Sequence, residues 1–444
     1  MTKVDTDIVT GDELVAELQA WLKTNWDPDL TVADWWERLG TAGWSAPTLP
    51  STAYGRGVSR VDAGRVAQEI GKFGALGAPG GLGLLLAAPT IAAHGTREQV
   101  DHYVRDIVTG QQSWCQLFSE PGAGSDLAGL TTRAVKDGDE FVVNGQKVWT
   151  SGAQMADMGM LLARTNFDVP KHQGITWFAI NMRQPGIDVR PLREMSGSSL
   201  FNEVFMTDAR VGEDGVIGGV NSGWNAANTT LANERAGLGA GAGGGAGGFG
   251  AMPGTVGGQL ARRAGDFVTP AEAQPRRRGG APFLRPSGAG QLMQLAKTKG
   301  VNTDPVVRQG LARLHTMNEV ARYNAERLKA VRASGGDIPG MANIAKLTMS
   351  DIMRLSRDLG LSIAGVDGTL HAYDEAGQKT LAAVRGGDFS VAMMTSLSLY
   401  AQAPPIYGGT DQIQRNIIGE RALGLPKEPG DDRVVPFSQL PKNG

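Results

Sequence analysis

The chain has 444 residues, 41% hydrophobic and 20% charged, a composition typical of a globular protein too long for one small core. Its net charge is −2 and its pI is near 6.3, so bulk electrostatics give no reason to expect nucleic acid or a membrane surface as a partner. The single cysteine, Cys115, excludes an intramolecular disulfide and a multi-cysteine metal site, and we expect it to be a buried apolar residue.

The sequence also bears on location and metal binding. The N-terminus is polar and lacks the apolar run of a signal peptide. The most apolar segment, residues 80–93, is interrupted by glycine and proline and is shorter than the roughly 20 residues that span a bilayer. The five histidines form no zinc-binding pattern. We therefore expect a cytoplasmic protein without a membrane segment or a metal site.

Residues 1–112 are predicted to form a helical domain. Residues 12–18 have the spacing of an amphipathic helix, and Thr31 stands where the N-cap of a second helix is expected. A break at 46–50, which contains two prolines, is followed by further helical spacing in 61–73 and 96–108.

Residues 113–218 change to strand spacing, with polar turns between short apolar runs. The expected strands are 130–134, 140–143, 146–151, 158–163, 176–180, 189–191 and 202–206. Asn144-Gly145 lies between two of these runs and predicts a hairpin turn. Gly122 and Gly124, in the loop before the first run, would let the backbone approach a planar or phosphorylated ligand closely.

From residue 219 onward the spacing is helical again, and residues 304–331 carry an apolar stripe that should face other helices. Residues 239–290 interrupt this region, because they are rich in glycine and proline and contain the basic clusters 262–263 and 276–278. We interpret them as an insertion or mobile loop. The order of a helical block, a β-block and a second helical block predicts an α+β fold.

Two motifs, SEPGAGSD at 119–126 and NGQKVWTS at 144–151, together resemble the flavin-binding middle domain of the acyl-CoA dehydrogenase family. Segments 197–211 and 405–426 are similar to the strand that closes that domain and to the YEGT-like segment near the C-terminus of the family. The resemblance implies FAD as cofactor. It also implies three domains: an N-terminal helical domain at 1–112, a middle β-domain at 113–218 and a C-terminal four-helix bundle at 219–444.

The resemblance further implies a set of flavin contacts. Trp149 would pack against the isoalloxazine with Ser151 near its N5 edge, and Ser119 and the backbone of Phe118 would contact the ring. The same resemblance places these further residues at the cofactor: Gly124, Ser125, Thr150, Gly409, Thr410 and Gln412. Without the resemblance, Thr410 or Asp411 is simply the N-cap of a helix that begins near 411.

Many members of the family carry their catalytic base as a glutamate at the place of Gly408. Glycine cannot remove a proton, but members similar to the isovaleryl and long-chain types have the base on an earlier helix, in a Glu-Arg pair. Glu234-Arg235 matches that pair, so we expect Glu234 to be the general base. The plain alternative is a helical glutamate that is paired or solvated.

The mechanism implied by the resemblance is an α,β-dehydrogenation of an acyl-CoA thioester to the trans-2-enoyl-CoA. Glu234 takes the α-proton, and flavin N5 accepts hydride from the β-carbon. The backbone N–H of Gly408 and a ribityl hydroxyl of FAD bind the developing enolate oxygen. Ser125 and Arg235 are the candidates for contacts with the CoA arm. A buried apolar pocket would raise the pKa of the base toward the working pH.

The resemblance also implies partners. Such enzymes form homotetramers or related oligomers, pass electrons to an electron-transferring flavoprotein and serve lipid metabolism, including β-oxidation. Arg308 is the candidate for a contact with a neighbouring subunit's FAD, but the Phe-Gly that follows this arginine in the family is missing, and the later segment 364–368 is altered too. These departures and the insertion resemble the actinobacterial acyl-CoA and sterol-side-chain dehydrogenases.

Three other interpretations stay open. The first is a flavin-holding binding protein that uses the basic residues at 262–285 for nucleic acid, which the acidic net balance disfavours. The second is a partner subunit that lost its base at Gly408, against which Glu234 argues. The third is an oxidase that uses O₂, because no motif reports how closed the pocket is.

Overall fold

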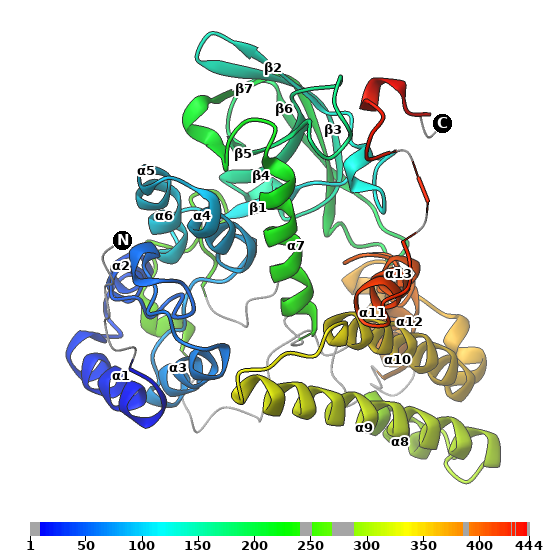
Figure 1. Cartoon of the computed structure of the whole chain (residues 1–444). Helices are drawn as coiled ribbons and strands as arrows, with labels where there is room; N and C mark the ends of the chain where they lie inside the picture. Colours follow the sequence, from blue (N-terminus) through cyan, green and yellow to red (C-terminus); the bar gives the residue numbers. More distant parts are fainter. Residues whose placement is uncertain are drawn as a thin grey trace.

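The structure is a computed structural model, and it describes residues 9–239, 251–268, 288–384, 390–427, 429–430 and 432–441. The described residues form helices at the N-terminus, a β-sheet in the middle and a second group of helices at the C-terminus (Figure 1). The predicted α+β fold is therefore confirmed.

The N-terminal part packs its helices around a core rich in tryptophan. Thr31 caps one helix as predicted, because its side chain accepts a hydrogen bond from Asp34 N at 3.0 Å. Trp35 is fully buried, and its Nε1 donates to Leu76 O at 2.7 Å, which satisfies the only polar atom of its side chain. The helices are α1 (Gly11–Asn25), α2 (Val32–Thr41), α3 (Arg60–Phe73), α4 (Ala88–His94), α5 (Arg97–Gln99) and α6 (Arg105–Val108), with π-helical turns η2 (Gly83–Ala87) and η3 (Val100–Val104).

The middle part is a mixed sheet with the strand order β6-β7-β3-β2-β4-β5-β8, to which β1 adds by pairing with β4. Antiparallel pairs dominate, but β1 and β4 are parallel, with Gln116 opposite Met160. The strands are β1 (Trp114–Leu117), β2 (Arg133–Asp137), β3 (Glu140–Ser151), β4 (Met158–Arg164), β5 (Ile175–Asn181), β6 (Ile187–Leu192), β7 (Phe201–Gly212) and β8 (Val216–Ile217).

The predicted hairpin at Asn144-Gly145 is wrong. Strand β3 runs without a turn from Glu140 to Ser151, and the Asn-Gly pair lies at an irregularity in its pairing with β7, between Val143 and Gly145. A Cβ on Gly145 would lie 2.8 Å from Thr132 Cα, so glycine serves close packing here and not chain reversal. The first predicted strand also begins three residues late, at Arg133, because residues 131 and 132 donate their amides to Glu120.

The C-terminal part is centred on helix α10 (Met341–Ala364), which contacts four of its neighbours there and also α7. Asp304 caps the long helix α9 by accepting from Val306 N and Val307 N. The other helices are α7 (Gly223–Gly239), α8 (Gly288–Thr298), α9 (Pro305–Ala333), α11 (Glu375–Val384), α12 (Ser390–Tyr400) and α13 (Asp411–Arg421). Among the described residues, no helix is both long and apolar enough to cross a membrane.

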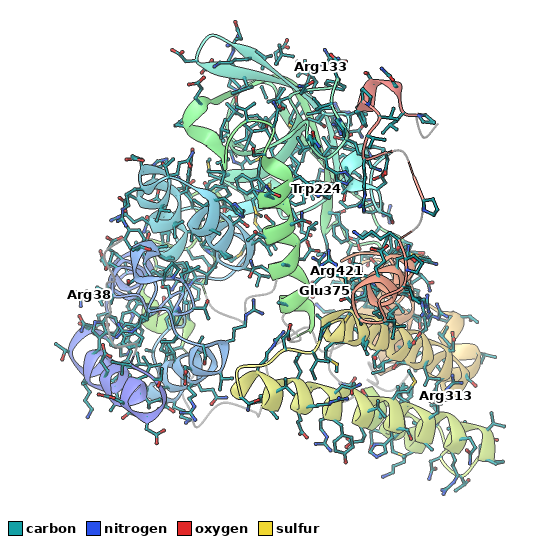
Figure 2. All side chains as sticks on the ribbon, viewed as in Figure 1. Arg38, Arg133, Trp224, Arg313, Glu375 and Arg421 are labelled. Atoms are coloured by element: carbon teal, nitrogen blue, oxygen red, sulfur yellow. The ribbon has the colours of Figure 1, made fainter. Side chains whose placement is uncertain are left out.

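Helix α7 lies at the centre of the molecule, between the two helical parts and below the sheet (Figure 1). It packs against α4 and η2 of the N-terminal part, β5 of the sheet and α10 of the C-terminal part. Figure 2 shows Trp224 at the end of α7 that lies near the sheet, and its ring contacts that of His172 at 4.8 Å between centroids. Residues on α7 can therefore face all three parts of the fold.

Cys115 is fully buried in strand β1, as predicted for an apolar structural residue. Burial raises the pKa of its thiol to about 12. The thiol therefore stays protonated at neutral pH and is no nucleophile.

Residues 251–268 are packed onto the N-terminal part, which corrects the expectation of a mobile loop for this portion of 239–290. The carbonyls of Arg262 and Leu260 accept from the first two amides of α2, those of Val32 and Ala33, at 2.8 and 3.0 Å. These amides have no partner inside their own helix, so the segment satisfies them. Ala264 is fully buried in the tryptophan-rich core. The rest of the expected insertion, 240–250 and 269–287, lies outside the described residues.

The same segment reaches the sheet through Thr255. The backbone N–H of Thr255 donates to Asp157 Oδ2 at 3.1 Å, and its hydroxyl bonds the same carboxylate. Ser113 adds a backbone donor to Asp157 Oδ2 at 2.8 Å. Asp157 closes the short turn that follows β3, so the segment ties the end of β3 to the N-terminal part.

We expect Gly254→Ala to lower the free energy of unfolding by about 3 kcal/mol, because φ is +94° there and a Cβ would collide with Ser113 Oγ and lie 2.6 Å from Asp157 Oδ2. Gly74→Ala is the matched control, since Gly74 has φ +80° but open space around its Cβ, and it should cost only about 1 kcal/mol. Urea unfolding followed by tryptophan fluorescence measures both. Equal losses would mean that residues 251–268 do not hold the fold.

The basic cluster at 262–263 is largely neutralised. Arg263 Nη1 lies 2.9 Å from Asp29 Oδ1, and Arg262 Nη2 lies 3.5 Å from Asp266 Oδ2. These two arginines are therefore paired with carboxylates, although their side chains remain more than half exposed. The other arginines of the predicted basic region, 276–278 and 285, lie outside the described residues.

Candidate functional site

A buried ion pair fixes the Gly-rich loop that follows β1. Lys147 Nζ lies 2.9 Å from Glu120 Oε1, with side chains 0% and 6% exposed, and it also donates to Phe118 O at 2.9 Å. Glu120 accepts further hydrogen bonds from Thr131 N, Thr131 Oγ1 and Thr132 N. Burial by itself would raise the pKa of Glu120, but the charge of Lys147 and these donors outweigh it and lower the pKa to about 2. The loop is therefore anchored to β3 by an ionised carboxylate.

This anchoring brings the two sequence motifs side by side. Val148 N donates to Ser119 O at 2.9 Å, so the loop residues Phe118 and Ser119 adjoin the end of β3, which carries Trp149 and Ser151. The far end of the loop is also held, because Lys171 Nζ contacts Asp126 Oδ1 at 2.9 Å and Asp432 Oδ2 at 2.8 Å. Between these anchors Gly124 and Ser125 are exposed.

Trp149 is held in an unusual conformation at the surface. Its φ is +61°, and the pairing of β3 with β7 shifts register between Lys147 and Thr150, so the residue lies at a bulge. The indole is 60% exposed, with an edge contact to Phe201 at 5.8 Å between centroids. A large apolar ring kept exposed by a strained backbone is typical of a binding surface.

Two buried polar atoms beside Trp149 have no hydrogen-bond partner. They are Thr150 Oγ1 and Asn202 Oδ1, although Asn202 Nδ2 donates to Thr150 O at 2.9 Å. Both side chains are fully buried, so these atoms lie beneath the surface and not on it. The exposed indole itself offers a ring face for stacking on a flat heteroaromatic molecule.

Glu234 lies on α7 and faces the sheet. Gln116 Nε2, on β1, donates to Glu234 Oε2 at 3.2 Å. Burial raises the pKa of Glu234 above the usual glutamate value, while the Gln116 bond and the nearby charge of Arg235 oppose the rise. A carboxylate shifted in this direction is suited to act as a base near neutral pH. Of the two plain alternatives, a solvated helical glutamate is wrong, because the side chain is partly buried, whereas a paired glutamate is compatible with the bond to Gln116.

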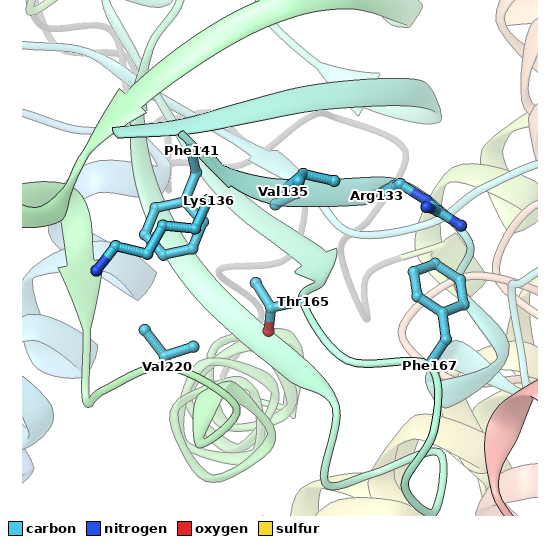
Figure 3. Close-up of a pocket in the computed structure, with 8 residues that line it drawn as sticks. Arg133, Val135, Lys136, Phe141, Thr165, Phe167 and Val220 are labelled. Atoms are coloured by element: carbon cyan, nitrogen blue, oxygen red, sulfur yellow. The ribbon is translucent and has the colours of Figure 1, made fainter. Parts of the chain in front are cut away.

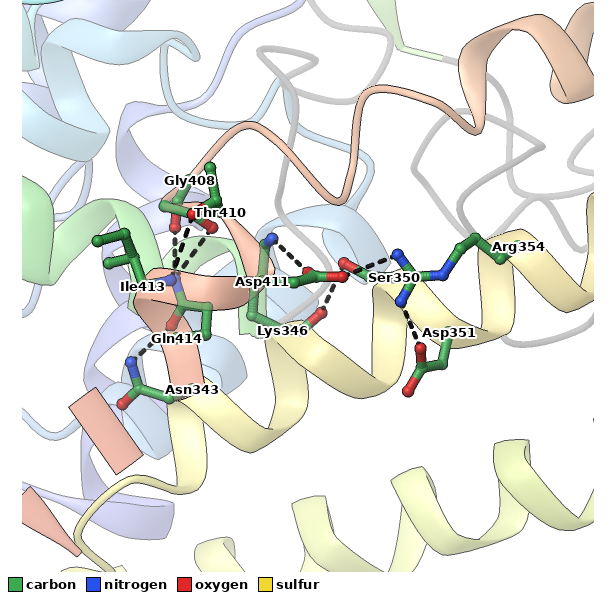
Figure 4. A network of polar contacts seen from close by, with 11 residues as sticks. Asn343, Lys346, Ser350, Asp351, Arg354, Gly408, Thr410, Asp411, Ile413 and Gln414 are labelled. Atoms are coloured by element: carbon green, nitrogen blue, oxygen red, sulfur yellow. Dashed lines mark hydrogen bonds and ion pairs between the residues drawn. The ribbon is translucent and has the colours of Figure 1, made fainter. Parts of the chain in front are cut away.

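The segment before α13 has a firmly held backbone (Figure 4). Gly408 and Gly409 have φ +63° and +84°, and Gln414 Nε2 donates to both of their carbonyls. Thr410 Oγ1 accepts from Ile413 N at 3.2 Å, which confirms the predicted cap of the helix that begins at Asp411. A glutamate at 408 would be strained in this left-handed conformation, which gives a physical reason for glycine.

A buried charge network holds the start of α13 on α10 (Figure 4). Asp411 bonds Lys346 Nζ at 3.1 Å and Arg354 Nη1 at 2.8 Å. Asn343 Nδ2 donates to Gln414 Oε1 at 2.6 Å. The backbone N–H groups of Gly408 and Gly409, which precede this network, have no acceptor among the described residues. Two adjacent free amides can bind an oxyanion.

The structure joins the predicted site residues in separate groups. The loop residues and the end of β3 form one group, to which Gln116 links Glu234. Among the described residues, no hydrogen bond or ion pair joins Glu234 to Gly408. Arg235 is partly buried and lies within electrostatic range of Arg421, which Figure 2 shows among the C-terminal helices. Gln412 and Arg308 are exposed, the latter in the first turn of α9.

Two surface hollows contain none of the predicted site residues. Figure 3 shows one of about 370 Å³ on the sheet, beside which Arg133 stacks over Phe167 at 4.5 Å from the ring centroid. The other, of about 700 Å³, lies between α4 and the end of the sheet and includes His94 and Asp214. The contacts described above, and not the hollows, therefore define the candidate site.

Sequence reasoning missed three residues that hold this site. Glu120 and Lys147 lie inside the two motifs, and their charges among glycines and apolar residues were the available signal. Gln116 gave no signal at all, because its partner is 118 residues away along the chain.

Three sequence models of one protein family match the chain. They are the acyl-CoA dehydrogenase N-terminal domain over residues 10–111, its middle domain over 115–209 and its C-terminal domain over 289–423. None of the three covers the stretch between 209 and 289, which contains α7 and residues 251–268.

Several similar proteins are mycobacterial. Acyl-CoA dehydrogenase IpdE1 of Mycobacterium tuberculosis is 32% identical over 394 residues, which are 89% of this chain and 88% of that protein. Acyl-CoA dehydrogenase FadE34 of the same organism is 40% identical over 307 residues, which are 68% of this chain but 41% of that longer protein. The crystal structure of the ChsE4–ChsE5 complex from M. tuberculosis has a TM-score of 0.63 and 26% identity, covering 94% of this chain and 98% of the matched chain.

Proposed function

Because the chain belongs to the acyl-CoA dehydrogenase family, a family of flavoprotein oxidoreductases, we propose that it uses FAD to convert an acyl-CoA thioester into the trans-2-enoyl-CoA, with Glu234 as general base. The observation that carries the proposal is the placement of Glu234. Its carboxylate is partly buried, has a raised pKa and is bonded to the strand that leads into the Gly-rich loop.

The residues at the loop and at the end of β3 fit a flavin. The exposed Trp149 offers a ring face, and the open space around Gly124 leaves room for a polar, planar group, with Thr150 directly after Trp149 on β3. Phe118, Ser119, Ser125 and Ser151 would complete this group, and Gly409, Thr410 and Gln412 would contribute from the segment before α13. FAD held by these residues would supply the acceptor for the hydride that leaves the β-carbon of the thioester.

Residues of the chain itself would remove the proton, stabilise the developing negative charge and bind the CoA arm. Glu234 removes the α-proton of the thioester, and its raised pKa brings the base closer to the working pH. The free backbone N–H of Gly408 donates to the thioester oxygen as negative charge develops there. The fixed left-handed backbone at Gly408 holds this amide in place. Arg235, with Arg421 nearby, supplies positive charge for the phosphates of the CoA arm, and Ser125 a hydroxyl.

We further propose that the working protein is an oligomer, a homotetramer or a related assembly, that passes its electrons to an electron-transferring flavoprotein. The similarity to a chain of the ChsE4–ChsE5 complex supports an assembled state and leaves a two-chain complex as an outcome of a mass measurement. The exposed Arg308 on α9 is available for a contact with the FAD of a neighbouring subunit.

The proposal is tested by anaerobic titration of the purified, FAD-loaded protein with a panel of short, branched, long and sterol-side-chain acyl-CoAs. We expect loss of the oxidised flavin absorbance with at least one thioester, and formation of the enoyl-CoA product detected by mass spectrometry. A protein that holds FAD but is bleached by no thioester would contradict a dehydrogenase and favour a binding role or a partner subunit. Repeating the titration in air separates a dehydrogenase from an oxidase.

A further inference from the structure

We propose that Gln116 is the positioning residue of Glu234, which aims one oxygen of the base and holds it in register with the loop that carries the flavin contacts. This inference rests on the proposed function. Gln116 and Trp114 lie on β1 and project to the same side of the sheet, because side chains alternate along a strand. Phe118, directly after the strand, belongs to the same core as Trp114. Cys115 and Leu117 point the other way, into the separate core between β3, β5 and β7.

The surroundings of Gln116 are apolar. Trp114 and Phe118 are both 4% exposed and belong to the core that also contains residues of α4 and α7. A polar side chain in such a row is stable only when its hydrogen bonds are made. Its amide reaches across the domain boundary and donates to Glu234 Oε2 at 3.2 Å. The bond is therefore a specific contact between two parts of the chain that meet only in the folded protein.

The geometry favours positioning over a simple structural bond. Only Oε2 of Glu234 receives a hydrogen bond from the described residues, so Oε1 stays free to accept a proton. Strand β1 is fixed by four consecutive pairs with β4, from Trp114 with Met158 to Leu117 with Leu161. Phe118 and Ser119 follow directly on the same backbone. The amide of Gln116 thus relates the base to the flavin loop through a rigid strand.

The charged groups around Glu234 are few. On its own helix Arg235 is the nearest, and Arg421 of α13 acts on Arg235. His94 of α4 and Arg60 of α3 form hydrogen bonds with other residues of α7, Thr229 and Asn233. On α10, Lys346 and Arg354 are paired with Asp411. Strand β5 and turn η2, which also pack against α7, contain no titratable residue. Among the described residues, Gln116 is the one hydrogen-bond donor to Glu234.

The test is Gln116→Met, which keeps the size and apolar fit of the side chain and removes the donor. Loss of a hydrogen bond to an ionised carboxylate should move the acidic limb of the pH profile of flavin reduction upward by about one pH unit. Gln116→Glu, which places a second carboxylate beside the first, should move it further in the same direction. Acyl-CoA binding and flavin content should stay unchanged in Gln116→Met.

The chain offers a matched control in Gln146→Met. Gln146 Nε2 donates to Glu203 Oε1 at 2.8 Å, so this variant also breaks a Gln–Glu bond in the middle domain, but away from Glu234. Its pH profile should match that of the wild type. If Gln116→Met behaves like Gln146→Met, the inference is overturned.

A second readout needs no turnover. In protein labelled with ¹³C at the glutamate δ-carbon, the signal missing from Glu234→Gln is that of Glu234, and its titration midpoint should rise in Gln116→Met and not in Gln146→Met. An unmoved midpoint contradicts the inference even where the enzyme is active. If no thioester reduces the flavin of the wild type, the proposed function fails. If reduction is lost in Glu234→Gln but the titration midpoint of Glu234 is unmoved in Gln116→Met, only the role of Gln116 fails.

Discussion

Replacing Glu234 by glutamine is expected to slow flavin reduction by acyl-CoA about 1,000-fold at neutral pH, because a positioned general base contributes roughly 10²–10⁴-fold to a proton transfer. Glutamine keeps the size of the side chain and can still bond Gln116, so the site should stay intact. Stopped-flow absorbance under anaerobic conditions measures the rate. Flavin content and the affinity for acyl-CoA, determined on the same samples, should equal those of the wild type.

Glu203→Gln is the matched control for this variant, because Glu203 also accepts from a glutamine side chain but lies on β7, away from α7. It should reduce its flavin at the wild-type rate. Equal reduction rates in Glu234→Gln and Glu203→Gln would clear Glu234 and require another base.

The raised pKa of Glu234 also predicts how the stability of the Glu234→Gln variant depends on pH. A carboxyl group whose pKa is higher in the folded than in the unfolded state stabilises the fold below the usual glutamate pKa, and this contribution is lost as the pH rises through the folded-state pKa. Glutamine has no charge to bury. The gain in urea resistance of Glu234→Gln over the wild type should therefore be larger at pH 8 than at pH 5. A catalytic base that costs stability at the working pH is expected when function and folding compete.

Lys147→Met is expected to lower the free energy of unfolding by about 3–5 kcal/mol, because it leaves the buried Glu120 without its counter-charge. The loop at 118–126 should loosen, and the purified protein should lose flavin. Urea unfolding and the absorbance of bound flavin measure the two effects. Lys136→Met is the matched control, since Lys136 also pairs with a glutamate, Glu213, but on the surface, and its loss should change neither quantity noticeably.

Glu120→Gln in the Lys147→Met background should recover part of the lost stability, because the amide oxygen can still accept from Thr131 and Thr132 without a buried charge. The pH dependence follows from the lowered pKa of Glu120. Its contribution is present above the unfolded value of 4.5 and is lost as the pH falls toward about 2. In Lys147→Met this acid-dependent loss should be smaller than in the wild type, because removing the counter-charge raises the folded-state pKa of Glu120. No rescue by the second change would mean that the buried charge is not the cause.

Part of the candidate site could be predicted from the sequence, because it lies in short contiguous motifs. The loop at 119–126 and the end of β3 are each local, and the cap at Thr410 follows from its own helix. Asn144-Gly145 shows the limit of such signals, since the same dipeptide can make a turn or a bulge. Here the pairing of β3 with β7 on one side and the close approach of Thr132 on the other kept the strand straight.

The sequence alone determined the α+β class, the burial of Cys115 and the family, because spacing and contiguous motifs encode them locally. Only the tertiary structure showed that Gln116 meets Glu234, that Lys147 anchors the Gly-rich loop and that residues 251–268 complete the N-terminal core. Each of these contacts joins positions far apart in the chain. Their strength depends on burial and distance, which exist only once the helices and the sheet have packed.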